Sequence, residues 1–162
     1  MFSKEASNKL PPHRPYNYKI VLEGEQKDQG YCPLYRMTQE ELAAVKKYIE
    51  EFFKYGFIVP SQASIALPVL FVRKPNRELR FYVNYRKLNA ITKKSRYPLP
   101  LIDETLAKLL KAEVFTKLDV RQAFYRIRMD PNSKDLTTFQ TRFGSYKYKA
   151  LPFGLTNGPL TY

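Results

Sequence analysis

The strongest constraint on the fold is a capped amphipathic helix that is followed by segments with the composition of β-strands. Thr38 and Glu41 stand three residues apart at its start, which is the spacing of a capping box. Apolar residues then recur every three or four positions, and Gly56 follows as a stop signal. This pattern predicts a helix over residues 38–55.

Two pairs of segments rich in β-branched and aromatic residues predict hairpins. The first pair is Leu67–Arg73 and Leu79–Tyr85, which are joined by the turn KPNRE. The second pair is Thr137–Phe143 and Tyr146–Leu151, which we expect to be joined by a Gly-Ser turn.

The remaining elements are shorter or carry weaker signals. We expect an edge strand over Tyr18–Leu22, a helix over Leu101–Lys111, a strand over Val114–Val120 and a helical turn over Gln122–Arg126. Helices and antiparallel strands are mixed without a regular βαβ alternation, and the predicted fold class is therefore α+β.

The charge balance favours a polyanionic partner. The chain of 162 residues carries 28 Lys and Arg against 15 Asp and Glu, a net charge of +13. Neutralising nucleic-acid phosphates releases counterions, so nucleic acid is the plain interpretation. A basic, highly soluble protein without such a partner is the alternative. No segment approaches the ~20 apolar residues of a spanning helix, and no membrane partner is expected. Cys32 is the only cysteine, which excludes an internal disulfide and fits a reducing, intracellular setting.

Asp119 is the residue with the clearest chemical potential. It stands at the end of the predicted apolar strand, where a carboxylate is costly to bury unless it is paired or binds a metal. Nucleotidyl transfer needs hard oxygen ligands of this kind to hold Mg²⁺ near a triphosphate. Position alone does not separate this role from a turn-capping aspartate, which accounts for most such residues.

Four stretches in order carry a family resemblance. They are RFYVNYRKLNAIT (80–92), RYPLPLIDE (96–104), FTKLDVRQAFYRIRM (115–129) and LPFGLTNGP (151–159). Together they resemble the reverse transcriptase of Ty3/gypsy-like long-terminal-repeat retrotransposon Pol polyproteins. The resemblance covers almost the whole chain. It implies the fingers and the first part of the palm of a right-hand polymerase, with an extended lead-in over residues 1–30 and the reverse transcriptase domain over 31–162.

The resemblance assigns roles around Asp119. It implies that Asp119 is the first metal-ligating aspartate and that the backbone carbonyl of Val120 helps to bind Mg²⁺. It also implies that Phe124 packs against the sugar of the incoming nucleotide and blocks a 2′-hydroxyl, while Ala123 leaves room for that nucleotide. A core aromatic is the alternative for Phe124.

Basic residues of the first hairpin are implied to bind the triphosphate. The resemblance gives this role to Arg80 and, with Arg73 as a competitor, to Lys74. A positively charged group there would neutralise developing charge. A solvated basic hairpin is the alternative for both residues.

Five further residues are implied to contact the template or the nucleotide. Arg86 and Asn89 look like supports of the template strand, or structural hydrogen-bonders. Phe153 and Gly154 lie in a loop that is implied to close under the nucleotide and the template base. Pro159 matches a template-grip position. Ordinary turn residues are the alternative for the last three.

The sequence departs from the family pattern at several positions. Asn84 stands where relatives usually carry Asp, Gly158 stands where Ala is common, and Gln122 and Arg126 also differ. The family's Tyr-x-Asp-Asp hairpin, which supplies two further carboxylates, is expected beyond Tyr162. The sequence is therefore interpreted as a truncated module, and the chain by itself is predicted not to polymerise DNA.

Three functional hypotheses follow. The first is an RNA-directed DNA polymerase module that adds dNTPs to a primer 3′-hydroxyl on an RNA or DNA template by a two-Mg²⁺ mechanism. It is expected inside cells, in a cytoplasmic virus-like particle and also in the nucleus. The second is a non-catalytic, basic nucleic-acid-binding remnant. The third is an unrelated RNA-binding protein of the ribosomal kind, in which Asp119 would lie far from Arg80.

Overall fold

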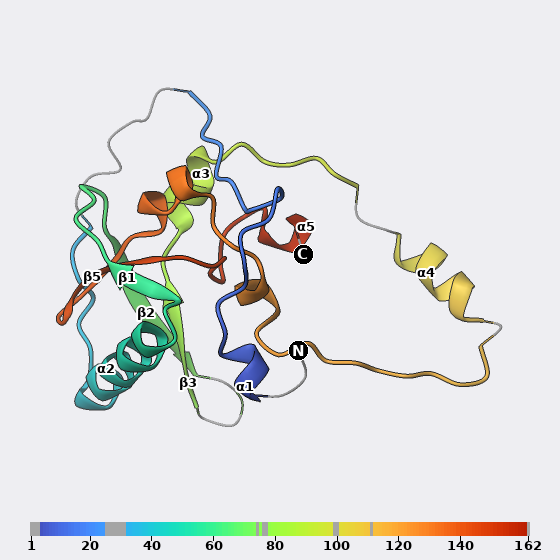
Figure 1. Ribbon diagram of the computed structural model, residues 1–162, viewed down its shortest axis with the longest axis horizontal. Coiled ribbons are helices and arrows are strands. Elements are labelled where there is room, and N and C mark those ends of the chain that lie inside the picture. The colour runs from blue at the N-terminus through green and yellow to red at the C-terminus, as the bar shows by residue number, and fades with distance from the viewer. Residues whose placement is uncertain are drawn as a thin grey trace.

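A small mixed sheet with helices around it forms the body of the protein (Figure 1). The computed structural model describes residues 4–24, 32–73, 75, 78–98, 101–110 and 112–161. The helices are α1 (Lys4–Ser7), α2 (Gln39–Lys54), α3 (Arg86–Ile91), α4 (Ile102–Leu109) and α5 (Gly158–Thr161), and the 3₁₀ turns are η1 (Ala123–Arg126), η2 (Pro131–Ser133) and η3 (Asp135–Thr137). The strands are β1 (Ile58–Pro60), β2 (Leu67–Arg73), β3 (Leu79–Val83), β4 (Phe139–Thr141) and β5 (Gly144–Tyr148).

The capped helix forms as predicted, within one residue at each end. The Thr38 hydroxyl accepts a hydrogen bond from the Glu41 amide at 3.2 Å, and the Glu41 carboxylate accepts one from the Thr38 amide at 2.8 Å. Gly56 follows with a φ of +72°, a left-handed conformation that costs glycine little. Val45 and Ile49 are buried on the inner face of α2.

The sheet has the strand order β1-β5-β4-β2-β3, with β2 and β4 parallel and the other neighbours antiparallel. Both predicted hairpins are confirmed, but the turn of the second was wrongly placed. Gly144 pairs with Thr141, so the chain turns at positions 142–143 and Gly144 begins β5. The Thr141 hydroxyl explains the difference, because it accepts from the Phe143 amide at 3.1 Å and donates to the Gly144 carbonyl at 3.0 Å.

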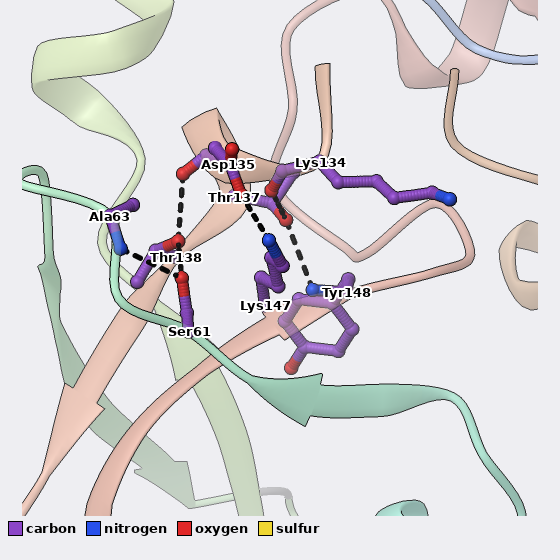
Figure 2. Close-up of polar contacts among 8 residues, drawn as sticks. All are labelled: Ser61, Ala63, Lys134, Asp135, Thr137, Thr138, Lys147 and Tyr148. Carbon is purple, nitrogen blue, oxygen red and sulfur yellow. Dashed lines mark hydrogen bonds and ion pairs between the residues drawn. The ribbon is translucent and has the colours of Figure 1, made fainter. Parts of the chain in front are cut away.

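Buried hydroxyls join η3 to the sheet (Figure 2). The Thr137 hydroxyl donates to the Lys134 carbonyl at 2.6 Å and accepts from the Tyr148 amide at 3.1 Å. Thr138 donates to the Asp135 carbonyl at 2.7 Å and lies 2.8 Å from the Ser61 hydroxyl. Both threonines are fully buried, and these contacts satisfy polar groups that would otherwise be costly inside the core.

The predicted strand over Val114–Val120 is wrong. The chain runs extended there, but the structure pairs it with no strand among the residues it describes. Val114, Phe115 and Leu118 are 82 %, 64 % and 70 % exposed. An alternating pattern forms a strand only where a neighbouring strand supplies hydrogen bonds and a surface that covers the apolar side chains. This segment, like α4, lies away from the sheet (Figure 1).

Two further predictions change in detail. The expected strand over Tyr18–Leu22 is reduced to isolated bridges, Tyr18 with Met129 and Leu22 with Thr92. The helix expected over 101–111 forms as α4, yet every residue in it is exposed. Across the described part of the chain, none of the helices has the length and apolar character needed to cross a membrane.

We predict that Thr137→Val destabilises the protein by about 1–3 kcal/mol, because the new side chain keeps the volume but leaves the buried Tyr148 amide without its acceptor. The Lys134 carbonyl loses the hydroxyl but keeps its bond from the Thr137 amide at 3.0 Å. Urea unfolding followed by circular dichroism measures the change. Thr116→Val, at an exposed position, is the matched control and should shift stability by less than about 0.5 kcal/mol. Equal effects of the two substitutions would contradict the role given to the buried hydroxyl.

Candidate active-site cleft

A cleft of about 830 Å³ lies between α2, β3, the η1 turn and the loop after β5. Segments far apart in the sequence meet there. Six residues that the sequence analysis selected line it together: Arg80, Asp119, Val120, Ala123, Phe124 and Phe153. The meeting of Asp119 with Arg80 and Phe124 argues against an unrelated RNA-binding protein, in which they would lie apart.

Aromatic rings hold Arg80 at the wall of the cleft. Its guanidinium carbon lies 4.9 Å from the ring centroid of Phe153 and 5.3 Å from that of Tyr82. Phe153 in turn packs edge-to-face on Phe124, with 4.9 Å between the centroids. These cation–π contacts hold the guanidinium near both rings, while the residue remains exposed and its N–H groups can reach an anion.

The η1 turn brings Ala123, Phe124 and Tyr125 to the cleft. Gln122 adopts a left-handed conformation with φ 52° and ψ 43°, which turns the extended chain sharply after Asp119 and Val120. Tyr125 then enters the core. A non-glycine residue in this conformation is uncommon, and such outliers often mark functional segments.

Tyr48 forms the floor of the cleft. Its hydroxyl lies 3.0 Å from that of Tyr125 and 2.9 Å from that of Tyr148, and its ring stacks on Phe52 and Phe81 at 4.0 and 3.9 Å. Burial raises the pKa of Tyr125 to about 12 and the pKa values of Tyr48 and Tyr148 well above 10. The phenols therefore stay neutral, and they position the η1 turn rather than exchange protons at neutral pH.

A second cavity, of about 250 Å³, brings together Arg86, Asn89 and Gly154. The Asn89 amide donates to the Gly154 carbonyl at 2.7 Å and accepts from the Thr156 amide at 3.0 Å. These bonds hold the loop after β5, which supports the structural alternative for Asn89. Gly154 has a φ of +99°, so a side chain there would be strained.

The remaining residues that the sequence analysis assigned to the site either lie apart from both cavities or fall outside the described residues. Pro159 is exposed in α5 and lines neither cavity. Lys74 lies outside the described residues. Its competitor Arg73 ends β2 and pairs with Glu40 of α2 at 3.3 Å, in an exposed ion pair.

The departures from the family pattern have local explanations. The Asn84 amide donates to the Tyr35 hydroxyl at 2.9 Å, a bond that an ionised Asp could not donate. A Cβ on Gly158 would sit 3.5 Å from the Phe124 ring, at ordinary contact distance, so the common Ala would also fit. Arg126 donates to the carbonyls of Ala6, Ser7 and Lys9, which attaches the N-terminal segment to η1.

Sequence reasoning missed Tyr48 and Tyr82 as parts of the site. Tyr48 stands four residues before Phe52 on the apolar face of α2, and this spacing could have placed it toward the sheet. Tyr82 stands two residues after Arg80 in β3, where alternate side chains share a face. Both signals predict proximity, but neither identifies a cleft.

Asp119 is the carboxylate of the cleft lining. No group of three or more His, Cys, Asp or Glu suited to a metal ion occurs among the described residues. A Mg²⁺ ion takes about six oxygen ligands, several of them water. Asp119 and Val120 therefore fit a metal site in part and do not complete one.

The fold is that of the fingers and first part of the palm of a polymerase. It superposes on the crystal structure of the prototype foamy virus protease-reverse transcriptase with a TM-score of 0.73 and 22 % identity, over 93 % of this chain and 21 % of that one. The family described as reverse transcriptase (RNA-dependent DNA polymerase) matches residues 72–162. The chain belongs to the reverse transcriptase family, whose members generally use divalent metal ions and bind nucleic-acid templates and primers.

The relatives are retrotransposon polyproteins, as the sequence resemblance implied. The chain is 36 % identical over 149 residues to the retrovirus-related Pol polyprotein from transposon 297 of Drosophila melanogaster, covering 89 % of the chain and 14 % of the relative. It is 35 % identical over 125 residues to the transposon Tf2-3 polyprotein of Schizosaccharomyces pombe, covering 77 % and 9 %. The chain thus spans a small part of the length of these relatives.

We predict that the protein loses stability above about pH 10, because burial raises the folded-state pKa values of Tyr48, Tyr85, Tyr125 and Tyr148 above the unfolded value near 10. Their contribution is fully present below pH 10. This contribution is lost as the pH rises toward the folded-state pKa values. The folded-state pKa of Tyr125 is about 12. Urea midpoints at about pH 9 and about pH 11, with phenolate absorbance, measure this loss. A stability that is constant across this interval would contradict it.

Proposed function

We propose that this chain supplies the nucleotide-binding part of an RNA-directed DNA polymerase that adds dNTPs to a primer 3′-hydroxyl on an RNA or DNA template. One observation carries the proposal: Arg80, Asp119 with Phe124, and Phe153 come from three separate stretches of sequence and line one cleft. A carboxylate, a guanidinium and aromatic rings are the groups that a nucleoside triphosphate with its cation needs.

Arg80 is proposed to bind the triphosphate. Arg80 is exposed at the cleft and its guanidinium contacts two rings, so little side-chain freedom is lost when it binds an anion. Lys74 is the second proposed triphosphate contact. Both cations would stabilise negative charge on the phosphoryl oxygens as the bond to pyrophosphate breaks.

Phe124 and Ala123 are proposed to define the sugar pocket. Phe124 packs on Phe153 and lies beside Gly158, so its ring is confined from two sides. A confined ring excludes a bulkier sugar by steric clash, which is a form of selection against the wrong substrate. Phe153 and Gly154 would form the surface under the nucleotide and the template base.

Asp119 and the Val120 carbonyl are proposed to contribute ligands to Mg²⁺. When bound, the cation neutralises charge on the triphosphate and polarises its phosphoryl oxygens. The partial ligand set means that other groups, from the polymerase or the substrate, must complete the coordination. Asp119 itself would contribute one negative charge to the cleft that Arg80 also lines.

Arg86, Asn89 and Pro159 are proposed template contacts, with Arg86 and Asn89 next to Gly154 in the second cavity. We further propose that residues 1–30 form a lead-in and 31–162 the polymerase portion, acting in a cytoplasmic virus-like particle and in the nucleus. The lead-in is not detached from the body, because Tyr18 and Ile20 are buried in the core cluster.

A non-catalytic nucleic-acid-binding protein is the second candidate. The net charge of +13 favours it, and so does the presence of one carboxylate, Asp119, among the described residues that line the cleft. This candidate predicts salt-dependent RNA binding by the chain and no dNTP incorporation even when a Tyr-x-Asp-Asp segment is joined to it.

The decisive experiment joins this chain to the downstream palm of a relative, such as the transposon 297 polyprotein, and assays dNTP incorporation on a primed RNA. We expect incorporation, and a loss of about 100-fold or more in Asp119→Asn, because several kcal/mol of charge stabilisation disappear. Asp103→Asn, on exposed α4, is the control and should retain activity. Undiminished incorporation by Asp119→Asn would refute the role of this carboxylate.

A second test concerns sugar selection. In the same joined protein, Phe124→Ala should raise the ratio of ribonucleotide to deoxyribonucleotide incorporation by about 10-fold or more, because the confined ring no longer opposes a 2′-hydroxyl. Phe124→Tyr keeps the ring and should leave the ratio unchanged. If Phe124→Ala lowers both incorporations equally, the ring supports the fold and does not select the sugar.

A further inference from the structure

A basic surface lies outside the cleft. It is built on three extended segments that run side by side. The Tyr18 amide donates to the Arg128 carbonyl at 2.7 Å, and the Met129 amide donates to the Lys149 carbonyl at 3.0 Å. A bridge also pairs Arg128 with Ala150. This pairing brings residues 13–19, 126–130 and 147–150 together, with Tyr18, Met129, Tyr148 and Ala150 buried beneath them.

Three cations lie in this area: Arg128 and Lys149 from the paired segments, and Lys134 from between η2 and η3. We call these three residues, together with His13, the basic cluster. The Arg128 guanidinium lies 2.8 Å from Nε2 of His13. Because a guanidinium only donates, Nε2 must accept, and the imidazole is neutral in this arrangement. A fourth positive charge is therefore kept out of the cluster.

The electrostatic balance of the basic cluster is strongly positive. The pKa of His13 lies below its usual value, and the largest cause is the Arg128 guanidinium. Desolvation and the charges of Lys134 and Lys149 lower this pKa further. Asp130 is the group that opposes this shift. Its carboxylate already accepts a hydrogen bond from the Asn132 amide at 2.9 Å. Like charges brought together in this way cost free energy that a polyanion would recover.

An exposed aromatic ring adjoins these cations. Tyr16 is 68 % exposed and lines a small cavity of about 30 Å³ together with Arg14, Arg126 and Arg128. A ring in water beside cations is the arrangement on which bases stack while the backbone phosphates contact the charges. An acidic peptide would satisfy the cations but would make no use of this ring.

We propose that the basic cluster and Tyr16 form a second binding surface for single-stranded nucleic acid, with phosphates at Arg128, Lys134 and Lys149 and a base on Tyr16. Within the described part of the chain, the residues that line the Tyr16 cavity differ from those that line the cleft. The two surfaces belong to different sides of the η1 turn, since Tyr125 and the residues before it face the cleft and Arg126 to Arg128 face the cluster. A strand held there can remain attached while the cleft is empty.

His13 reports on this surface alone, because it is the only histidine of the chain. The test follows its imidazole signal by NMR over a pH titration of the full chain, with and without a short single-stranded DNA. A phosphate beside Arg128 offsets the positive charges that lower the His13 pKa, so the titration midpoint should move upward when DNA binds. An unchanged midpoint at saturating DNA would overturn the proposal.

Charge variants provide the second arm. Arg128→Gln combined with Lys149→Gln should abolish the His13 response and lower the slope of log affinity against log salt by about 1.4, at about 0.7 per lost phosphate contact. Lys46→Gln combined with Lys47→Gln removes the same charge from the exposed face of α2 and should leave the His13 response intact. Equal effects of the two double variants would show general charge attraction and overturn a defined surface.

Competing ligands and Tyr16 complete the test. Tyr16→Ala should weaken DNA binding about 5- to 100-fold while preserving the circular dichroism spectrum, because one stacked base is lost. Inorganic phosphate and polyglutamate, at matched charge concentration, should move the His13 midpoint much less than DNA does. An equal shift with either one would identify a general anion site and refute the assignment to nucleic acid.

Discussion

The packing of Tyr48 against the sheet is the interaction on which the rest of the structure depends. Its ring lies between Phe52 and Phe81, and its hydroxyl reaches both Tyr125 and Tyr148. One side chain thus joins α2, β3, η1 and β5. Since Tyr125 and Tyr148 are buried, these contacts satisfy phenol groups that the core could not otherwise accommodate. The cleft exists because this contact holds the η1 turn against β3.

The same turn separates two surfaces with different chemistry. Toward the cleft it presents the aromatic ring of Phe124, near one carboxylate and one arginine. Beyond Tyr125 it presents Arg126 and Arg128, whose guanidinium groups contact backbone carbonyls and His13. Part of the positive charge is thus gathered where extended segments from both halves of the sequence meet, apart from the cleft.

Most local elements could be predicted from the sequence, because their signals lie within a few residues. The capping box at Thr38 and the strands of both hairpins needed only spacing and residue type. The errors arose where a distant partner decides the outcome. The segment from Val114 to Leu118 alternates like a strand, but no strand among the described residues pairs with it. The turn of the second hairpin lies two residues earlier than predicted, because the hydroxyl of Thr141 bonds to the residues that follow it.

The sequence by itself determined the family, the residue types at the site and the net charge of +13, because ordered motifs and charge counts need no coordinates. The tertiary structure decided which residues share a surface. It placed Asp119 in the cleft with Arg80, and it bonded the Asn89 side-chain amide to the Gly154 carbonyl. It also brought His13 into contact with Arg128, which is 115 positions away in the sequence. Proximity of this kind depends on strand pairing and core packing between distant segments, which local patterns do not encode.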